Sequence, residues 1–223
     1  MPLDDFKDPK VKQTYVDFYL GKEIELTFND ERVIKFKIAE LDVFFESSGA
    51  IYRNYHLVDA ENILSQTCVI DLGSKNDTQI VFSNQIMPVP GKNHMGNNGI
   101  NRPLRMLARE LERILGENTL PIPVVESIIV GETKIESLTD EVLNKAIKEA
   151  TVEVVRQIKN TTDTFELRKT LTKILFTGGS SIVLKPYLKE VYENAGYTVY
   201  FSKDARYDNS KGALIKALNK KRA

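Results

Sequence analysis

DLGSKNDT, residues 71–78, is a polar turn between two apolar segments. The flanking segments, Thr67–Leu72 and Thr78–Phe82, have the composition of buried strands, and we predict that they pair centrally in a sheet. Glycine lets backbone N–H groups approach phosphate oxygens, the Ser74 hydroxyl adds a donor, and an aspartate at a strand end can hold a hydrated magnesium ion. Taken alone, the pattern suits an ordinary hairpin with Asn and Asp in its turn equally well.

A second turn, TGGSS at residues 177–181, follows the predicted strand Lys173–Thr177 and precedes the predicted helix Pro186–Asn194. Adjacent glycines at a strand end leave a flat backbone surface on which an adenine ring and a ribose can lie. Such connections also occur in many unrelated α/β proteins. Neither a G-x-x-x-x-G-K-[ST] loop nor a G-x-G-x-x-G fingerprint is present, which argues against a P-loop enzyme or a dinucleotide-binding fold.

Hydrophobic periodicity predicts an α/β protein with a substantially parallel sheet. The predicted helices are Val11–Tyr19, Asn101–Leu115 ended by Gly116, a helix from near Ser137 to Ile158 with a Ser137–Asp140 capping box, and Lys211–Lys220. The further predicted strands are the half-buried Glu23–Phe28 and Val33–Ile38, joined by a turn at Asn29–Glu31, and Thr198–Ser202. We expect Val124–Val130 to be a loop entering a strand.

Composition restricts the function classes. The chain has 223 residues, and its 31 Lys and Arg balance its 31 Asp and Glu, so no positive field indicates direct nucleic-acid or membrane binding. A single cysteine, Cys68, cannot form an internal disulfide, and Met1–Lys12 is too polar for a signal peptide or an anchor. His56 and His94 lack neighbours at metal-ligand spacing. We therefore expect a cytoplasmic protein with a small-molecule or protein partner.

The order of the two turns, followed by NSKGA at residues 209–213 opening the last helix, resembles the ParM group of plasmid-segregation actin-like ATPases. The resemblance covers almost the whole chain and implies an actin-like ATPase fold. Residues 1–66 would be a remnant of domain I, residues 67–202 the ribonuclease-H-like domain II, and residues 203–223 a connecting helix. Residues 1–6 are similar to the stretch after the middle of the family's domain I, so domain I would be incomplete.

Carried over by position, the resemblance implies two nucleotide-binding loops. The second phosphate loop would contain Asp71, Gly73, Ser74, Lys75 and Asn76, and the adenosine loop would contain Gly178, Gly179 and Ser180. Gly96 and Asn98, just before the Asn101 helix, would approach the ribose and base, although a plain helix cap explains them equally well. The implied cofactor is ATP or ADP with magnesium, which Asp71 would orient through water.

Two further roles follow from the same resemblance. Glu46 matches the acid that orients the attacking water, and with Asp71 it is the candidate catalytic pair, although an ordinary exposed glutamate fits as well. Asn209, Gly212 and Ala213 would form the hinge between domains, where small residues let two helices cross closely.

Two departures from the family pattern are expected to impair ATP hydrolysis. Asp77 stands where a hydroxyl is expected and would repel the γ-phosphate, and no first D-x-G turn precedes Asp71. We therefore expect a truncated or divergent actin-like nucleotide-binding protein that self-associates, pairs with a longer actin-like homologue or binds a plasmid adaptor. The alternative is a non-enzymatic module that binds or caps filaments of a longer partner. A sugar or acetate kinase of the same superfold lacks a substrate signature here.

Overall fold

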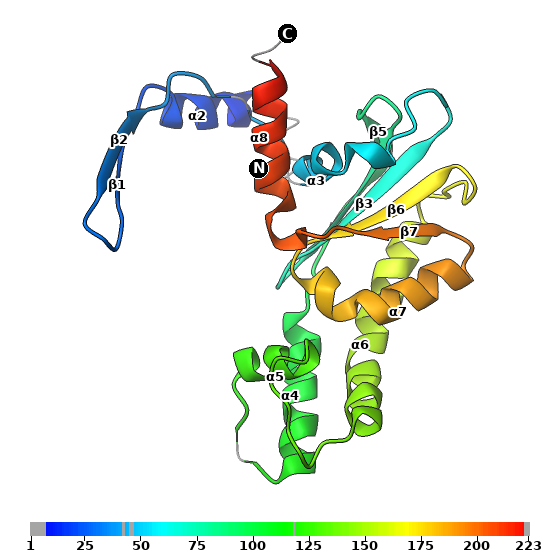
Figure 1. Ribbon diagram of the computed structural model, residues 1–223. Helices are drawn as coiled ribbons and strands as arrows, with labels where there is room; N and C mark the ends of the chain where they lie inside the picture. Colours follow the sequence, from blue (N-terminus) through cyan, green and yellow to red (C-terminus); the bar gives the residue numbers. More distant parts are fainter. Residues whose placement is uncertain (1–7, 42, 45–46, 118, 221–223) are drawn as a thin grey trace.

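The structure is a computed structural model that describes residues 8–41, 43–44, 47–117 and 119–220 (Figure 1). Its helices are α2 (Pro9–Tyr19), α3 (Ser48–Arg53), α4 (Asn101–Leu115), α5 (Ile122–Ile129), α6 (Asp140–Asp163), α7 (Ser180–Asn194) and α8 (Asp208–Lys220), with 3₁₀ turns η1 (Tyr55–Leu57) and η2 (Ala205–Tyr207). Its strands are β1 (Glu23–Thr27), β2 (Val33–Lys37), β3 (Gln66–Leu72), β4 (Asp77–Ser83), β5 (Pro88–Gly96), β6 (Thr172–Thr177) and β7 (Thr198–Phe201). None of the helices in these ranges is long and apolar enough to cross a membrane.

The main sheet has five strands in the order β5-β4-β3-β6-β7, and β1 and β2 form a separate two-stranded sheet. β3, β6 and β7 are mutually parallel, whereas β3, β4 and β5 form an antiparallel meander. The predicted pairing of the two strands around DLGSKNDT is confirmed. The sheet is less parallel than expected, because tight turns join β3, β4 and the unpredicted β5, and such turns connect only antiparallel strands.

Helices cover both faces of this sheet (Figure 1). The larger core lies on the face covered by α4, α5, α6 and α7, and a smaller core lies under α3 on the other face. β3 serves both cores because alternate side chains point to opposite faces. Cys68 and Ile70 enter the larger core, and Val69 enters the smaller one; all three are fully buried.

The prediction of a loop and strand at Val124–Val130 was wrong, because this segment lies mostly in α5. Pro121 is the N-cap of α5, and Pro123 lies in its first turn, where the fixed φ of proline suits a helix. Val125 and Ile128 are buried on one side of the helix. A short apolar run cannot be assigned to a strand or a helix by periodicity alone.

Helices α6 and α7 are among those that begin elsewhere than predicted. The hydroxyl of Thr139, not that of Ser137, caps α6 by accepting a hydrogen bond from the Val142 amide at 3.4 Å. α7 begins at Ser180, so that Pro186 lies inside the helix rather than at its start. The α4 prediction is confirmed at both ends, including Gly116, which ends it with φ +70°.

The first helix and hairpin, α2 and β1–β2, form what we call the arm, and it projects away from the sheet (Figure 1). The register places Ile24 opposite Phe36 and Leu26 opposite Ile34 on one face of the hairpin. This face is apolar, yet Leu26 is 46%, Ile34 48% and Phe36 42% exposed. The predicted hairpin is therefore confirmed, but the prediction that its strands are half-buried was wrong.

Candidate functional site

The two predicted turns lie side by side. β3 and β6 are parallel and in register up to Asp71 opposite Thr177, so both chains turn at the same edge of the sheet. Ligands of open α/β sheets bind at this edge, beyond the carboxyl ends of the strands. The Ser180 hydroxyl donates a hydrogen bond of 2.7 Å to the Gly73 carbonyl, which joins the turns directly.

Gly178 is the closest point between the turns. Its φ is +80°, in the left-handed region that favours glycine. A β-carbon there would lie 2.4 Å from the Leu72 carbonyl oxygen and 2.5 Å from Oδ1 of Asp71. Any other residue would push the two turns apart.

The loop after β5 closes over the first turn. The amides of Gly99, Ile100 and Asn101 donate to the carbonyls of residues 75, 73 and 74 at 3.2, 3.4 and 2.9 Å. A β-carbon on Gly99 would lie 2.3 Å from the Lys75 carbonyl carbon, so the position requires glycine. The sequence placed the GNNG stretch, residues 96–99, near the ribose and base, but did not indicate that Gly99 packs against the first turn.

Asp77 lies in the interior, with partners that the sequence did not indicate. Its side chain is fully buried, where Oδ1 accepts from the Asn98 amide at 3.2 Å and Oδ2 accepts from the Gln79 side chain at 3.1 Å. Gln79 in turn accepts from the Thr162 hydroxyl at 2.8 Å, and Thr162 lies 2.6 Å from the Tyr192 hydroxyl. The acid therefore anchors the loop after β5 to α6 and α7.

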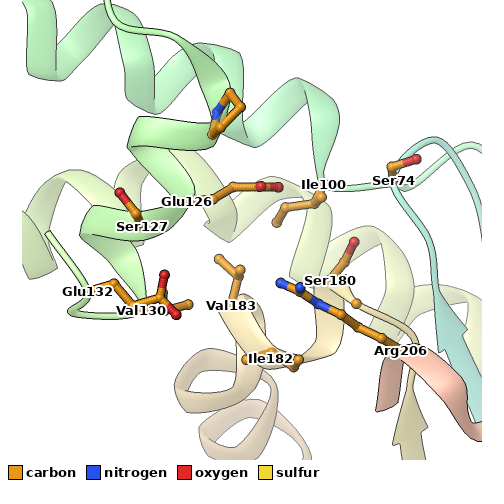
Figure 2. Close-up of a pocket in the computed structure, with 12 residues that line it drawn as sticks. Ser74, Ile100, Glu126, Ser127, Val130, Glu132, Ser180, Ile182, Val183 and Arg206 are labelled. Atoms are coloured by element: carbon orange, nitrogen blue, oxygen red, sulfur yellow. The ribbon is translucent and has the colours of Figure 1, made fainter. Parts of the chain in front are cut away.

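A cavity of about 710 Å³ opens beside the joined turns (Figure 2). Its volume is within the range of small-molecule sites. One wall comes from Ser74 and Ile100, and another from the start of α7. The remaining lining residues come from α5, the segment after it and η2: Pro123, Glu126, Ser127, Val130, Glu132 and Arg206.

Opposite charges point into this cavity. Figure 2 shows Glu126 reaching in from α5 and Arg206 from the other side, past Ser180. A β-carbon on Gly179 would lie 3.6 Å from Cγ of Arg206, so the arginine stem runs along the bare glycine. Ile182 and Val183 add an apolar surface. Nothing in the local sequence indicated Glu126 or Arg206, because they meet only in the fold.

Asp71 lies at the edge of the turns among polar groups. Its Oδ2 accepts from the Asn209 side-chain amide at 2.7 Å and from the Ser47 hydroxyl at 3.4 Å. Oδ1 of Asn209 is buried and has no hydrogen-bond partner among the described residues. Carboxylate and amide oxygens suit magnesium, which keeps several waters and phosphate ligands. No group of three His, Cys, Asp or Glu able to hold a metal occurs in the described part of the chain.

The predicted hinge residues lie where α8 crosses α3. A β-carbon on Gly212 would lie 1.7 Å from the Gly49 carbonyl oxygen, so the helices meet backbone to backbone. α8 begins at Asp208, before the predicted Lys211, because Asp208 accepts hydrogen bonds from Thr177 at 2.6 Å and Ser202 at 2.7 Å. Sequence reasoning missed Gly49.

The remaining predicted site residues are distributed around the turns. Of the predicted nucleotide-binding residues, Ser74, Gly179 and Ser180 line the cavity. Lys75 lines a separate groove, and the Asn76 carbonyl accepts from Gly73 within the turn. Gly96 packs against Asp77 and His94, and Asn98 binds Asp77, so both support the loop rather than line the cavity. Ala213 is partly buried beside Gly212 on α8, and Glu46 lies outside the described residues.

Comparison with known families gives one match, in which residues 108–204 resemble the Alp7A C-terminal domain. This range begins within α4 and ends after β7. Comparison with curated proteins gives no match.

Several solved structures share the fold. Ta0583, an archaeal actin homologue in complex with ADP, aligns with a TM-score of 0.73 at 17% identity, covering 99% of this chain and 70% of its own. A 15-stranded ParM filament from Clostridium botulinum aligns with a TM-score of 0.71 at 21% identity, covering 97% of this chain and 65% of the ParM chain. The actin-like protein Alp7A aligns with a TM-score of 0.68 at 20% identity, covering 96% of this chain and 63% of the Alp7A chain.

These likenesses establish the fold. The chain has an actin-like fold, and the expected resemblance to ParM-type actin-like proteins is confirmed. Almost all of this chain aligns, and it spans about two thirds of the length of these structures. One relative is a complex with ADP and another is a filament.

Proposed function

We propose that this protein binds an adenine nucleotide in the cavity beside the two turns. The observation that carries the proposal is that Ser74 of the first turn and Gly179 and Ser180 of the second line one cavity of about 710 Å³. Residues 67–202 would then act as the nucleotide-binding domain II of the actin-like fold. The ADP complex of Ta0583 supports this assignment.

The chemistry of the walls suggests an orientation. The 15-residue helix α7 starts at the turns, and a helix N-terminus favours phosphate. Apolar Ile182 and Val183 suit the base, and the Glu126 carboxylate can accept hydrogen bonds from ribose hydroxyls. The Arg206 guanidinium can stack on an aromatic ring. The phosphates would thus lie toward Ser74, and the nucleoside toward α5.

Magnesium would bind with the nucleotide at Asp71. The Asp71 carboxylate and the unpartnered Asn209 oxygen supply hard oxygen ligands, directly or through water. Bound magnesium would neutralise charge on the phosphates. Asn209 on α8 donates a hydrogen bond to Asp71. Asn209 therefore connects the proposed magnesium position to the crossing of α3 and α8, which is the proposed hinge.

Within this fold, we propose a role in nucleotide-dependent self-association of the kind used by plasmid-segregation filaments, with slow ATP hydrolysis. The C. botulinum ParM filament supports self-association. One observation favours a second candidate function: the exposed apolar face of the arm suits a non-enzymatic module that binds or caps filaments of a longer actin-like partner.

Nucleotide binding is tested by filling the cavity without disturbing the fold. Gly179 has no positive φ, and its neighbour Arg206 is flexible, so Gly179→Val should fold while displacing Arg206 over the cavity. We expect the affinity for ADP, measured by titration calorimetry with magnesium, to fall at least about tenfold, or 1.4 kcal/mol. Asn194→Val adds the same side chain at the opposite, exposed end of α7 and should leave affinity unchanged. Equal affinity in both variants would refute the site.

Turnover separates the two candidate functions. An ATPase should release phosphate only with magnesium and should lose that activity in Asp71→Ala. A capping module should sediment with filaments of a longer ParM-type protein whether or not Asp71 is present. Phosphate release that is unchanged in Asp71→Ala would remove Asp71 from the mechanism.

A further inference from the structure

A second groove, of about 520 Å³, lies beside the first turn and shares Ser74 with the proposed nucleotide cavity. It is lined by Ser74, Lys75, Asn97, Gly99, Asn101, Arg102, Arg105, Met106 and Arg109. Four of these residues are cationic and none is acidic. On α4, positions 102, 105 and 109 are three and four residues apart, so their side chains form one row about 10 Å long.

The cations of this row are exposed and unpaired. Lys75, Arg102, Arg105 and Arg109 take part in no ion pair or side-chain hydrogen bond among the described residues, whereas Arg113 on the same helix pairs with Glu110. The chain as a whole has no net charge, with 31 Lys and Arg against 31 Asp and Glu, so this cluster of positive charge is a local feature of the surface. Three guanidinium groups that converge on a groove suit carboxylates or phosphates, which they bind bidentately.

The surroundings of the groove favour a peptide over a nucleic-acid duplex. Glu110 lies next to Arg109 along the chain. The pKa of Glu153 on α6 is lowered mainly by the hydrogen bond that Arg156 donates to it, and also by the charge of Arg102, so Glu153 lies near this end of the row. A duplex, which carries a phosphate every 1.7 Å or so along its axis, would place phosphates over these acids. Met106, 48% exposed, offers an apolar contact that a peptide can use.

The same chain carries an acidic segment without partners. Glu136, Asp140 and Glu141, before and in the first turn of α6, are exposed and form no ion pair among the described residues. The equally acidic stretch at residues 23–32 differs, because Glu25 pairs with Lys35 and Asp30 with Arg32. The segment Glu136–Glu141 therefore offers three carboxylates, none of them paired among the described residues, to a partner.

We propose that the acidic segment Glu136–Glu141 of one copy docks into the Arg102, Arg105 and Arg109 groove of a second copy. Charge complementarity carries the assignment, since three unpaired carboxylates within six residues can reach a row of about 10 Å. Each copy carries both the groove and the segment, so the contact can repeat from copy to copy. This inference rests on the self-association part of the proposed function.

Reciprocal charge reversal tests the contact. One variant carries Arg102→Glu, Arg105→Glu and Arg109→Glu, and the other carries Glu136→Lys, Asp140→Lys and Glu141→Lys. None of these residues lines the nucleotide cavity. We expect each variant alone to lose association at least about tenfold in sedimentation velocity with ADP and magnesium, because like charges then meet. An equimolar mixture restores complementary pairs and should associate as wild type does.

Circular dichroism and ADP affinity verify that each variant is folded. If neither variant associates and the mixture does not either, the pairing of these two surfaces is overturned. Association of both variants at the wild-type level also overturns it, as does a groove variant that loses only the binding of a DNA duplex. A wild-type chain that stays monomeric while ADP binds removes this inference and self-association together, but leaves the nucleotide site standing.

Discussion

The β3–β4 and β1–β2 hairpins are both antiparallel pairs, and both were predicted from their sequences, yet their surroundings are opposite. In β3–β4, nearly every residue is buried between two cores. In β1–β2, only Ile24 is partly buried, although apolar and charged residues alternate at positions 23–26 and 34–37. Alternation therefore predicts that a strand forms and which face is apolar. Whether anything covers that face depends on parts of the fold, or on partners, that the strand itself does not encode.

Truncating an apolar side chain in each hairpin should give the largest contrast. Ile70→Ala removes a fully buried side chain from the larger core and should lower the free energy of unfolding by about 3 kcal/mol or more. Leu26→Ala removes a side chain that is already 46% exposed, and should cost less than about 0.5 kcal/mol. Urea unfolding of both variants measures the difference. A cost above about 1 kcal/mol for Leu26→Ala would show that the face is covered in solution.

The pH dependence of stability should sharpen the view of β3 as a dry interior. Burial raises the pKa of the Cys68 thiol from 9.0 to about 12. Between these values the unfolded chain loses the proton first, so stability is complete below pH 9 and falls as pH rises toward 12. From pH 8 to pH 10 the loss attributable to Cys68 should be about 1.4 kcal/mol.

Cys68→Ala provides the reference for this measurement. The variant should be less stable than wild type at pH 8 but should lack this share of the decline, so its urea midpoint should fall less between pH 8 and pH 10. Parallel pH profiles for wild type and variant would show that the thiol is not shielded from water in the native state.

The smallest effect is expected on the charged face of the arm. Glu25 and Lys35 are cross-strand partners with an ion pair of 2.8 Å, and both side chains are more than half exposed. Exposed pairs contribute little because water and salt screen them. Lys35→Ala should change the free energy of unfolding by less than about 0.5 kcal/mol, and 0.5 M salt should erase the difference. A larger, salt-resistant loss would indicate that the arm is packed against something.

Much of the fold could be predicted from local signals. Pro103 in the first turn and Gly116 after the last residue define α4, and the two polar turns correctly indicated strand ends that lie side by side. The failures have local causes too. The apolar run at Val124–Val130 has no periodicity that separates a strand from a helix, and Pro186 imitates a helix start inside α7.

The candidate site was less accessible to sequence reasoning. Gly73, Ser74 and the residues of the second turn could be proposed because glycines and hydroxyls at strand ends have a known chemistry. The packing roles of Gly99 and Gly49 could not, because each glycine is required by the close approach of a segment far along the chain. The partner of Asp77 from the loop after β5 was hidden for the same reason, because the Asn98 amide reaches Asp77 only once β5 has folded back along β4.

The lone cysteine has a practical consequence. Because the Cys68 side chain is fully enclosed and its thiol keeps its proton at neutral pH, maleimide and iodoacetamide reagents should leave the native chain unmodified. A cysteine introduced on the surface of the arm or of α4 would then carry a fluorophore at a single known place. Distances and motions between copies could be followed in this way without first altering the interior.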